Sequence, residues 1–282
     1  MMTTCCGSSR TGGASYTPPL DALVSKVWAS FGLTRHFAGI ADSLRVRESG
    51  GSTEQDIGTL VDGGFDVASF TGFIGANNGF ARTAYDQKAG NTGSDLEQGT
   101  AASQPQVIAA SNLNGKAALR FANTRLGGTF AGVSMSALGT GDFEVWIVAH
   151  PTSSAGHKCV AIIGGLAYFY TTTSGNGKAG IYLSSTGGHT FNQAVSANVS
   201  HLLRFYRVSG TVFCDVDGAT APNSWAMSDN LVKAANYFWG VTGTEQFAGD
   251  MAEFTIFSSA LTNAERDALK TALADYYNLT VA

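Results

Sequence analysis

The chain has 282 residues, of which 44% are hydrophobic and 13% are charged, and its formal net charge is −4. This length suits one large β-sandwich, and the apolar fraction is sufficient for a sizeable core. Because no cluster of Lys and Arg interrupts the mildly acidic balance, we expect no nucleic-acid partner. No apolar run approaches the roughly 18 residues that a membrane-spanning helix needs, so we expect no membrane partner.

The first residues predict an arm rather than a folded element. Residues 1–17 are rich in Gly, Ser and Thr and cannot bury enough apolar surface to fold alone. We therefore expect a flexible docking arm over residues 1–17 and a single domain over residues 18–282. The arm contains no basic segment followed by an apolar one, so no signal peptide is expected.

An apolar stripe at helical spacing runs over residues 20–31. It follows Pro18 and Pro19 and stops at Gly32, and prolines at a helix start with glycine just past its end are typical of helix boundaries. The pattern predicts an N-terminal helix.

Two further helices are predicted downstream. Asp66 is suited to cap a short helix, whose buried side would carry Val67, Phe70 and Ile74. Thr262 and Glu265 have the spacing of a capping box and precede an amphipathic stripe, which predicts a C-terminal helix.

Between these helices, most apolar segments alternate with a period of two residues and predict β-strands. The expected strands cover residues 43–48, 54–58, 80–85, 106–108, 116–121, 143–150, 160–163, 167–171, 180–183, 201–208, 211–216 and 250–257. The side chains expected to be buried are Leu44, Val46, Phe121, Phe143, Val145, Ile147, Phe205, Phe254, Ile256, Leu269 and Leu273. The sequence therefore predicts a mainly β protein.

A long turn is predicted within residues 80–108, where glycines and short polar residues follow a strand. We expect a structural loop built on Asp86, Gln87, Asn91, Asp95 and Gln98. The Asp86 carboxylate would accept hydrogen bonds from backbone N–H groups and hold the crossover between two strands.

The same loop begins a resemblance to a known superfamily. Its run Tyr85-Asp86-Gln87, with Gly90-Asn91 after it, resembles a Trp/Tyr-Asp-Gln-Ser-Gly-Asn-Gly segment of concanavalin A-like, laminin-G-like jelly rolls. Segments within residues 44–58, 116–121 and 249–277 are similar to further motifs of that superfamily. It includes bacteriophage structural proteins and the catalytic domain of fungal-type α-L-arabinofuranosidases. The resemblance implies a two-sheet antiparallel jelly-roll sandwich with flanking N- and C-terminal helices.

No catalytic residue is assigned. A glycosidase needs two carboxyl groups about 5–10 Å apart around the scissile bond. The resemblance to arabinofuranosidases implies acidic residues in Asn/Gly-rich motifs near residues 140–190, beside a vicinal disulfide. That region contains only Asp142 and Glu144, without those motifs, and the adjacent Cys5 and Cys6 lie far away in sequence. We therefore favour a protein without enzymatic activity and leave the question open.

A ligand-binding face is predicted on the strand over residues 143–150. Glu144, Trp146 and His150 fall on one side of this strand, where they could bind a sugar ring by stacking and hydrogen bonds. The alternative is that a loop or a neighbouring subunit covers this face.

No metal or cofactor site is predicted. Asp215 and Asp217 provide two carboxylates, well short of the six to eight oxygen ligands of Ca²⁺, and Asp217 is better suited to a turn. The five histidines are scattered without metal-ligand spacing. Cys159 and Cys214 are expected to be free thiols in a reducing compartment, with a disulfide between them as the alternative.

Three functions remain in view. The first is a bacteriophage virion structural protein (capsid decoration, fibre or minor tail component), made in the host cytoplasm and contacting host-surface glycans. Its partners would be other virion proteins through residues 1–17, further copies of itself, in a trimer by analogy, and a glycan. The alternatives are a carbohydrate-binding module and a carbohydrate-active enzyme of arabinofuranosidase type.

Overall fold

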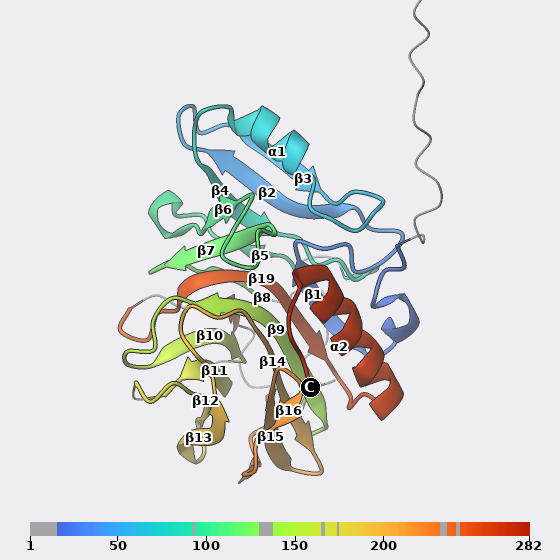
Figure 1. Ribbon diagram of the computed structural model, residues 1–282, viewed down its shortest axis with the longest axis vertical. Coiled ribbons are helices and arrows are strands. Elements are labelled where there is room, and N and C mark those ends of the chain that lie inside the picture. The colour runs from blue at the N-terminus through green and yellow to red at the C-terminus, as the bar shows by residue number, and fades with distance from the viewer. Residues whose placement is uncertain are drawn as a thin grey trace, which may run out of the picture.

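The computed structural model describes residues 16–91, 94–129, 138–164, 167–173, 175–231, 236–240 and 243–282, and they form a β-sandwich (Figure 1). The first sheet contains β1 (Val27–Gly32), β2 (Asp42–Glu48), β3 (Glu54–Gly58), β4 (Gly79–Ala84), β6 (Gln106–Ile108), β7 (Ala118–Ala122), β9 (Phe143–Pro151), β14 (His201–Val208), β15 (Thr211–Val216), β16 (Ala219–Thr220), β17 (Trp225–Ala226) and β19 (Ala248–Phe257). The second sheet contains β5 (Leu96–Glu97), β8 (Leu126–Thr129), β10 (Lys158–Ile163), β11 (Ala167–Thr172), β12 (Lys178–Leu183), β13 (Gly187–Ala194) and β18 (Asn236–Trp239). The helical elements are η1 (Asp21–Leu23), α1 (Val67–Ile74), η2 (Ala101–Ser103) and α2 (Asn263–Tyr277).

The two sheets are joined at β4, which pairs with β2 and β6 in the first sheet and with β5 in the second. The first sheet runs β3-β2-β4-β6-β7-β19-β9-β14-β15, and β1 pairs with the second half of β19. The second sheet runs β5-β8-β18-β10-β11-β12-β13. Every one of these pairs is antiparallel, which confirms the predicted fold class.

Strand β9 shows how the sequence pattern separates the two sides of the first sheet. Phe143, Val145 and Ile147 belong to the core between the sheets, whereas Trp146 and Val148 belong to a second apolar layer outside it. This is the period-two alternation that the sequence predicted. The structure also confirms burial of the predicted core residues: Leu44, Val46, Phe121, Phe143, Val145, Ile147, Phe205, Phe254, Ile256, Leu269 and Leu273.

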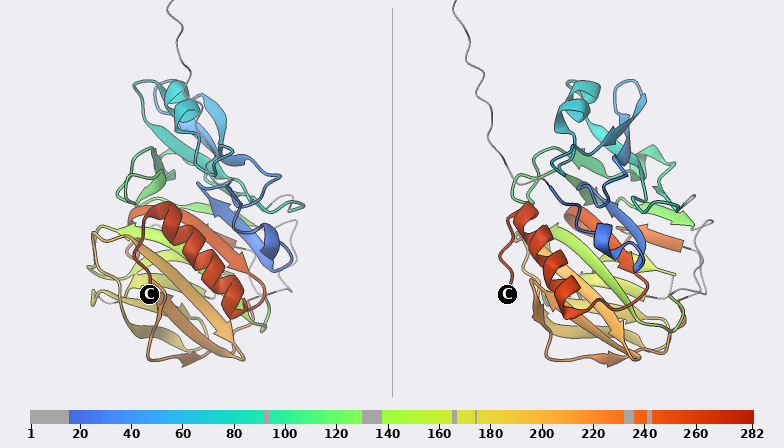
Figure 2. Two further views of the ribbon diagram at one scale, coloured as in Figure 1. Left: turned by 45° about the vertical axis from the view of Figure 1, so that its right-hand side comes forward. Right: turned by 90° about the vertical axis from the view of Figure 1, so that its right-hand side faces the viewer.

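Helix α2 covers the outer face of the first sheet and closes the second apolar layer (Figure 2). It begins with the predicted capping box, in which the Thr262 hydroxyl accepts from the Glu265 N–H and the Glu265 carboxylate accepts from the Thr262 N–H. Leu269, Leu273 and Tyr277 are buried against the sheet. The helix therefore closes this part of the outer face of the first sheet.

The predicted N-terminal helix over residues 20–31 is wrong. Asp21–Leu23 forms only a short 3-10 helix, and Val27–Gly32 is strand β1, paired with β19. All 6 residues of β1 are buried. A strand with apolar residues on both faces has no period-two alternation, so its apolar residues can fall at helical spacing by coincidence.

Helix α1 starts where it was predicted, because the Asp66 carboxylate accepts a hydrogen bond from the Ser69 N–H at 2.9 Å. Phe70 is buried, and Ile74 packs against the core. Val67, also expected on the buried side, is 37% exposed. It lies in the first turn, ahead of the residues that contact the sheet.

Cys159 on β10 and Cys214 on β15 are buried free thiols. The two strands lie in different sheets, so the alternative of a disulfide between them is wrong. Burial raises the pKa of both thiols. Cys5, Cys6 and most of the arm predicted over residues 1–17 lie outside the described residues. No described helix is both long and apolar enough to cross a membrane.

A buried carboxylate on β19 ties β19 to α2 and to the chain that follows β1. Glu253 is 1% exposed, and its Oε1 accepts hydrogen bonds from the Thr34 hydroxyl at 2.9 Å and from the Tyr277 hydroxyl. Its Oε2 pairs with Nε2 of His36 at 2.5 Å, and Nδ1 of His36 lies 2.6 Å from the Ser30 hydroxyl. We call Glu253, His36, Tyr277, Thr34 and Ser30 the Glu253 network.

The Glu253 network explains Gly32, which the sequence pattern assigns to the end of a helix but which lies in β1. A Cβ atom on Gly32 would lie 1.9 Å from Oε2 of Glu253 and 2.5 Å from Cε1 of His36. A side chain at position 32 would therefore displace the Glu253 carboxylate or the His36 ring, which favours glycine there.

We predict that Gly32→Ala lowers the free energy of unfolding by about 1–3 kcal/mol, the usual cost of overpacking a buried site. Thermal and denaturant unfolding would measure the change. Gly39→Ala is the matched control, because a Cβ at Gly39 meets nothing within 4 Å. Equal stability of the two variants would contradict this role for Gly32.

Candidate functional site

The predicted ligand-binding face is not open at Glu144 and Trp146. Glu144 is fully buried, and its carboxylate accepts hydrogen bonds from Nε and Nη2 of Arg204, both at 2.8 Å. It also accepts from Nε1 of Trp146 at 2.9 Å and from the Leu261 N–H at 2.7 Å. The expectation that these two side chains meet a ligand directly is corrected, since α2 and the segment before it cover them.

His150 is separated from the other two residues. It lies further along β9, is 9% exposed, and its Nδ1 is 3.1 Å from the Ser200 hydroxyl. Burial lowers its pKa from 6.5. Glu144, Trp146 and His150 therefore do not form one exposed face.

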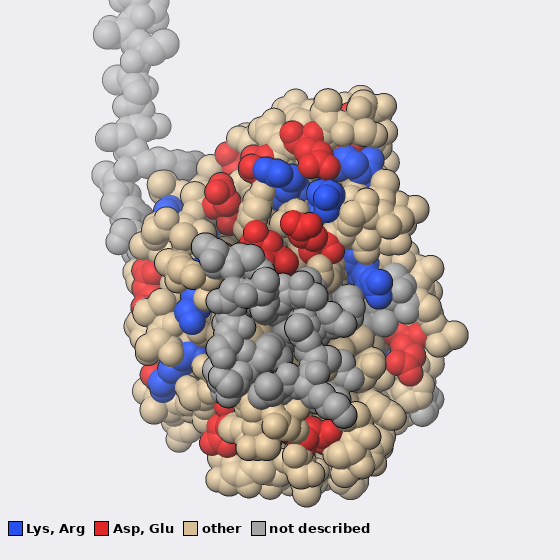
Figure 3. Space-filling model, turned by 180° about the vertical axis from the view of Figure 1, so that it is seen from behind, with Lys and Arg blue, Asp and Glu red and all other residues tan. Residues whose placement is uncertain are grey.

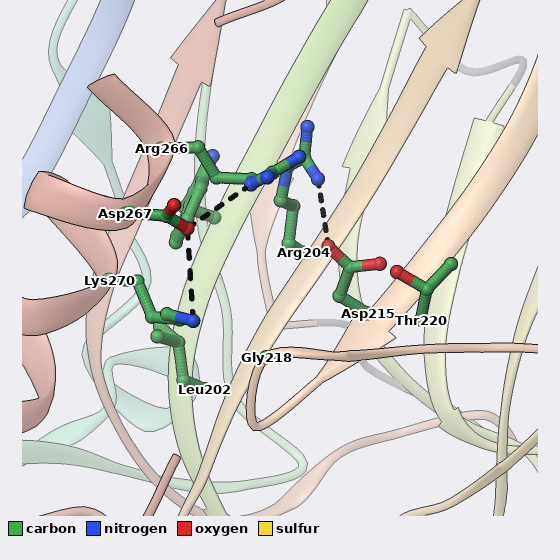
Figure 4. A pocket seen from close by; sticks show the side chains of 9 residues that line it. Leu202, Arg204, Asp215, Gly218, Thr220, Arg266, Asp267 and Lys270 are labelled. Atoms are coloured by element: carbon green, nitrogen blue, oxygen red, sulfur yellow. Dashed lines mark hydrogen bonds and ion pairs between the residues drawn. The ribbon is translucent and has the colours of Figure 1, made fainter. Parts of the chain in front are cut away.

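A cavity of about 120 Å³ lies between α2 and strands β14 and β15, with Trp146 in its wall (Figure 4). Three cations and two carboxylates line it. Arg204 bonds Asp215 at 2.7 Å, and Asp267 lies 3.6 Å from Arg266 and 3.8 Å from Lys270. Because all five side chains take part in ion pairs within the protein, we interpret the cavity as a junction between helix and sheet.

The structure also separates Asp215 from Asp217. Asp215 points toward Arg204, whereas Asp217 has a positive φ of 53° and its carboxylate lies 2.7 Å from Nδ1 of His201. Asp217 thus lies in the turn that follows β15. Within the described ranges, no group of three or more His, Cys, Asp and Glu side chains could hold a metal ion.

A second cavity, of about 350 Å³, lies on the outer face of the second sheet, and we call it the tyrosine cleft. It is lined by His157, Tyr170, Thr173, Ile181, Tyr182, Gly188, Thr190 and Glu245. The alternation of side chains along β11 and β12 places its tyrosines on this face. Phe169 and Ile181 point into the core, so their neighbours Tyr170 and Tyr182 point outward.

Aromatic side chains form the walls of the tyrosine cleft. The Tyr170 hydroxyl donates to the Glu245 carboxylate at 2.9 Å, and the His157 ring stands edge-on to Tyr170 with centroids 5.6 Å apart. Tyr182 is 42% exposed and packs edge-to-face on Tyr168 at 5.7 Å. Burial raises the pKa of Tyr170, which keeps its hydroxyl protonated as a donor.

The tyrosine cleft has only one acidic lining residue, Glu245. None of the residues outside the described ranges is Asp or Glu, so the structure places every carboxylate of the chain. The cleft can therefore stack a flat apolar surface and hydrogen-bond to polar groups, but it lacks a carboxylate pair. Alternation over residues 167–171 and 180–183 could have revealed its two tyrosines. Glu245 lies in a turn before β19 and carries no sequence signal.

The predicted structural loop connects to β1. The Asp86 carboxylate accepts from the backbone N–H of Ser30 and of Lys88, both at 3.0 Å, and from side chains of Asn91 and Ser94 at 2.7 and 2.8 Å. The carboxylate therefore joins the loop to the first sheet as well as to itself.

The other four loop residues also bond backbone groups. Gln87 donates to the carbonyls of Gly32 and Thr34 at 2.8 and 2.9 Å and accepts from the His36 N–H at 2.8 Å. The Asn91 side chain donates to the Trp28 carbonyl at 2.8 Å. Asp95 accepts from the Asp86 N–H at 2.9 Å, and Gln98 accepts from the Thr100 N–H at 3.0 Å. Gln87 thereby fixes the segment that carries His36.

Comparison with solved structures shows the same fold in carbohydrate-active enzymes. An arabinofuranosidase complexed with arabinofuranosyl-α-1,2-xylobiose superposes with a TM-score of 0.71 at 13% identity, over 94% of this chain and 66% of that one. A GH54 α-L-arabinofuranosidase soaked with a cyclic sulfate inhibitor gives 0.71 at 14% identity, over 91% and 65%. The chain thus spans slightly less than two thirds of each enzyme.

These similarities show that the chain shares a β-sandwich fold with the two arabinofuranosidases. No protein-family model matches the chain. No curated protein matches it either.

We predict that Asp86→Ala lowers the free energy of unfolding by about 1–3 kcal/mol, because it leaves buried donors without an acceptor.

Burial also raises the pKa of Asp86 above 3.8 despite its donors. A carboxyl group with a raised pKa in the folded protein adds to the free energy of unfolding below pH 3.8, where it is protonated in both states. This added stability is lost as the pH rises through the folded pKa. Asp86→Asn should remove that pH dependence. Unchanged stability together with lost ligand binding would make this loop a recognition site instead.

Proposed function

We propose that this protein binds glycans through the tyrosine cleft. The observation that carries the proposal is the arrangement of Tyr170, Tyr182 and Glu245 around one cavity. Tyr182, 42% exposed, supplies an open aromatic surface, and the buried Tyr170 ring lines the cleft beside it. The Glu245 carboxylate accepts hydrogen bonds, and this combination suits a sugar with one apolar face and several hydroxyls. The cavity volume of about 350 Å³ lies within the range of small-ligand sites.

Arabinofuranoside hydrolysis is the second candidate, and the fold shared with arabinofuranosidases supports it. The cleft offers Glu245 as its one carboxylate, whereas a glycosidase of the usual mechanism uses two. Binding without hydrolysis is therefore the better explanation of this geometry.

We propose further that the protein is a bacteriophage virion component that contacts host-surface glycans. The support is the resemblance of the Tyr85–Asn91 loop and the C-terminal segment to phage jelly-roll proteins. In this proposal residues 1–17 dock onto other virion proteins, and three copies assemble by analogy with fibres. Mass spectrometry of purified particles would test the location.

The glycan proposal predicts saturable binding of neutral oligosaccharides, with arabinoxylan oligosaccharides as the first probe, measured by isothermal titration calorimetry. Tyr182→Ala should weaken binding at least about fivefold, because an aromatic contact contributes about 1 kcal/mol beyond its buried area. Tyr85→Ala is the matched control. Tyr85 hydrogen-bonds Asp56 at 2.6 Å and does not line the cleft.

Sugar release, followed in the same samples, separates the two candidates. Binding without release supports the glycan-binding proposal. Arabinose release that Glu245→Gln abolishes would establish the hydrolase instead. A failure of folded protein to bind any oligosaccharide on a broad glycan array would overturn the proposed function.

A further inference from the structure

A row of polar and aromatic side chains crosses the first sheet, on the face opposite its core. Cross-strand partners follow one another from β2 to β9: Arg47, Phe80, Gln106, Arg120, Asp250 and His150. Directly opposed residues of antiparallel strands lie on the same face. The pairing register alone therefore places these six side chains in one line.

The two ends of the row differ in exposure. Asp250 is fully buried and accepts from the Asn112 N–H at 2.9 Å, and His150 is 9% exposed. The members from Arg47 to Arg120 instead line a groove of about 490 Å³. Three strand spacings separate these two arginines, roughly 14 Å, so the groove crosses the strands over the length of an oligosaccharide rather than a single small group.

The protein holds both guanidinium groups of the groove in place. Nε and Nη2 of Arg120 donate to the two Asp250 oxygens at 2.8 and 3.0 Å. Nε of Arg47 donates to Gln104 at 2.7 Å, and the guanidinium lies over the Phe80 ring at 5.2 Å. Within the described ranges, Nη1 of Arg120 and Nη2 of Arg47 donate no hydrogen bond, and Nη1 of Arg47 lies 3.5 Å from the Glu48 carbonyl. Each arginine therefore retains donors for a ligand.

Arg47 lacks the acidic partners that nearby arginines have. Arg45 pairs with Asp56 at 2.8 Å, and Arg82 lies 3.6 Å from both Glu54 and Glu97. Figure 3 shows the same intermingling of acidic and basic side chains on the face seen from behind. Arg47 has no carboxylate within ion-pair distance anywhere in the described ranges. Its positive charge is thus available to an anionic ligand.

We propose that this groove binds a saccharide that carries carboxylate groups. A planar guanidinium matches a carboxylate with two parallel hydrogen bonds, which Arg47 can offer at one end of the groove. The Gln106 amide and the Ser49 hydroxyl, both lining the groove, suit the hydroxyls of a sugar. The Gln104 amide is buried and already bonds Arg47 and the Gln98 carbonyl, so it holds Arg47 in place rather than meeting the ligand. This site is on the first sheet and is independent of the tyrosine cleft.

The test is calorimetric titration of the full chain with an oligogalacturonate and with its carboxyl-reduced counterpart of equal length. The acidic oligosaccharide should bind, and the reduced one should bind at least about tenfold more weakly. Arg47→Gln should weaken binding of the acid by about tenfold or more. Arg45→Gln is the matched control on the same strand and should change affinity less than twofold.

A Tyr182→Ala variant that keeps its affinity for the oligogalacturonate would show that this site does not depend on the tyrosine cleft. Equal binding of the acidic and reduced oligosaccharides, or an equal loss in Arg45→Gln, would overturn the proposal. Tighter binding of a sulfated oligosaccharide than of the uronate would overturn the carboxylate assignment. Thermal unfolding of each variant would confirm that it is folded.

Discussion

The carboxylate of Glu253 is the polar group around which this sandwich is assembled. It lies in β19, the strand that pairs with β1, β7 and β9. A carboxyl group removed from water is tolerated only when donors or a cation replace its hydration. His36, Thr34 and Tyr277 supply those partners, and each comes from a segment outside β19. Forming the network therefore requires the β1–β2 connection and α2 to be in their final places.

This constraint determines which surfaces remain open for ligands. Tyr277 holds the end of α2 against the first sheet, and the helix then covers Trp146 and Glu144. One half of that sheet is closed as a result, and the uncovered half carries the groove at Arg47. The outer face of the second sheet carries the tyrosine cleft. A sandwich without α2 would present a different face to a sugar.

Much of the architecture could be predicted from alternation and capping patterns. Period-two runs such as residues 143–150 gave correct strands and correct faces, because one face of that strand is wholly apolar and the other carries Glu144 and His150, although both faces are buried. The capping box at Thr262 gave a correct helix start, since its hydrogen bonds are local in sequence. The helix expected over residues 20–31 is wrong because both faces of β1 carry apolar residues, which removes the alternation that distinguishes a strand.

The candidate sites depended on contacts between distant segments, and these were only partly predictable. The outward direction of Tyr170 and Tyr182 follows from local alternation, but Glu245 joins them from a loop about 75 residues after Tyr170. The row from Arg47 to His150 exists only through the register of five strand pairs. Sequence placed Glu144 on the correct strand face, yet it could not show that Arg204 and Leu261 use its carboxylate.

The central claim, that the Glu253 network couples α2 to the sheet, is tested most directly by a double-mutant cycle. The measurement is the free energy of unfolding of the wild type, Glu253→Gln, Tyr277→Phe and the double variant. If the carboxylate and the hydroxyl act as one unit, the two effects are not additive, and the coupling energy falls in the range of about 0.5–3 kcal/mol found for residues in direct contact. Additivity within about 0.3 kcal/mol would contradict the claim.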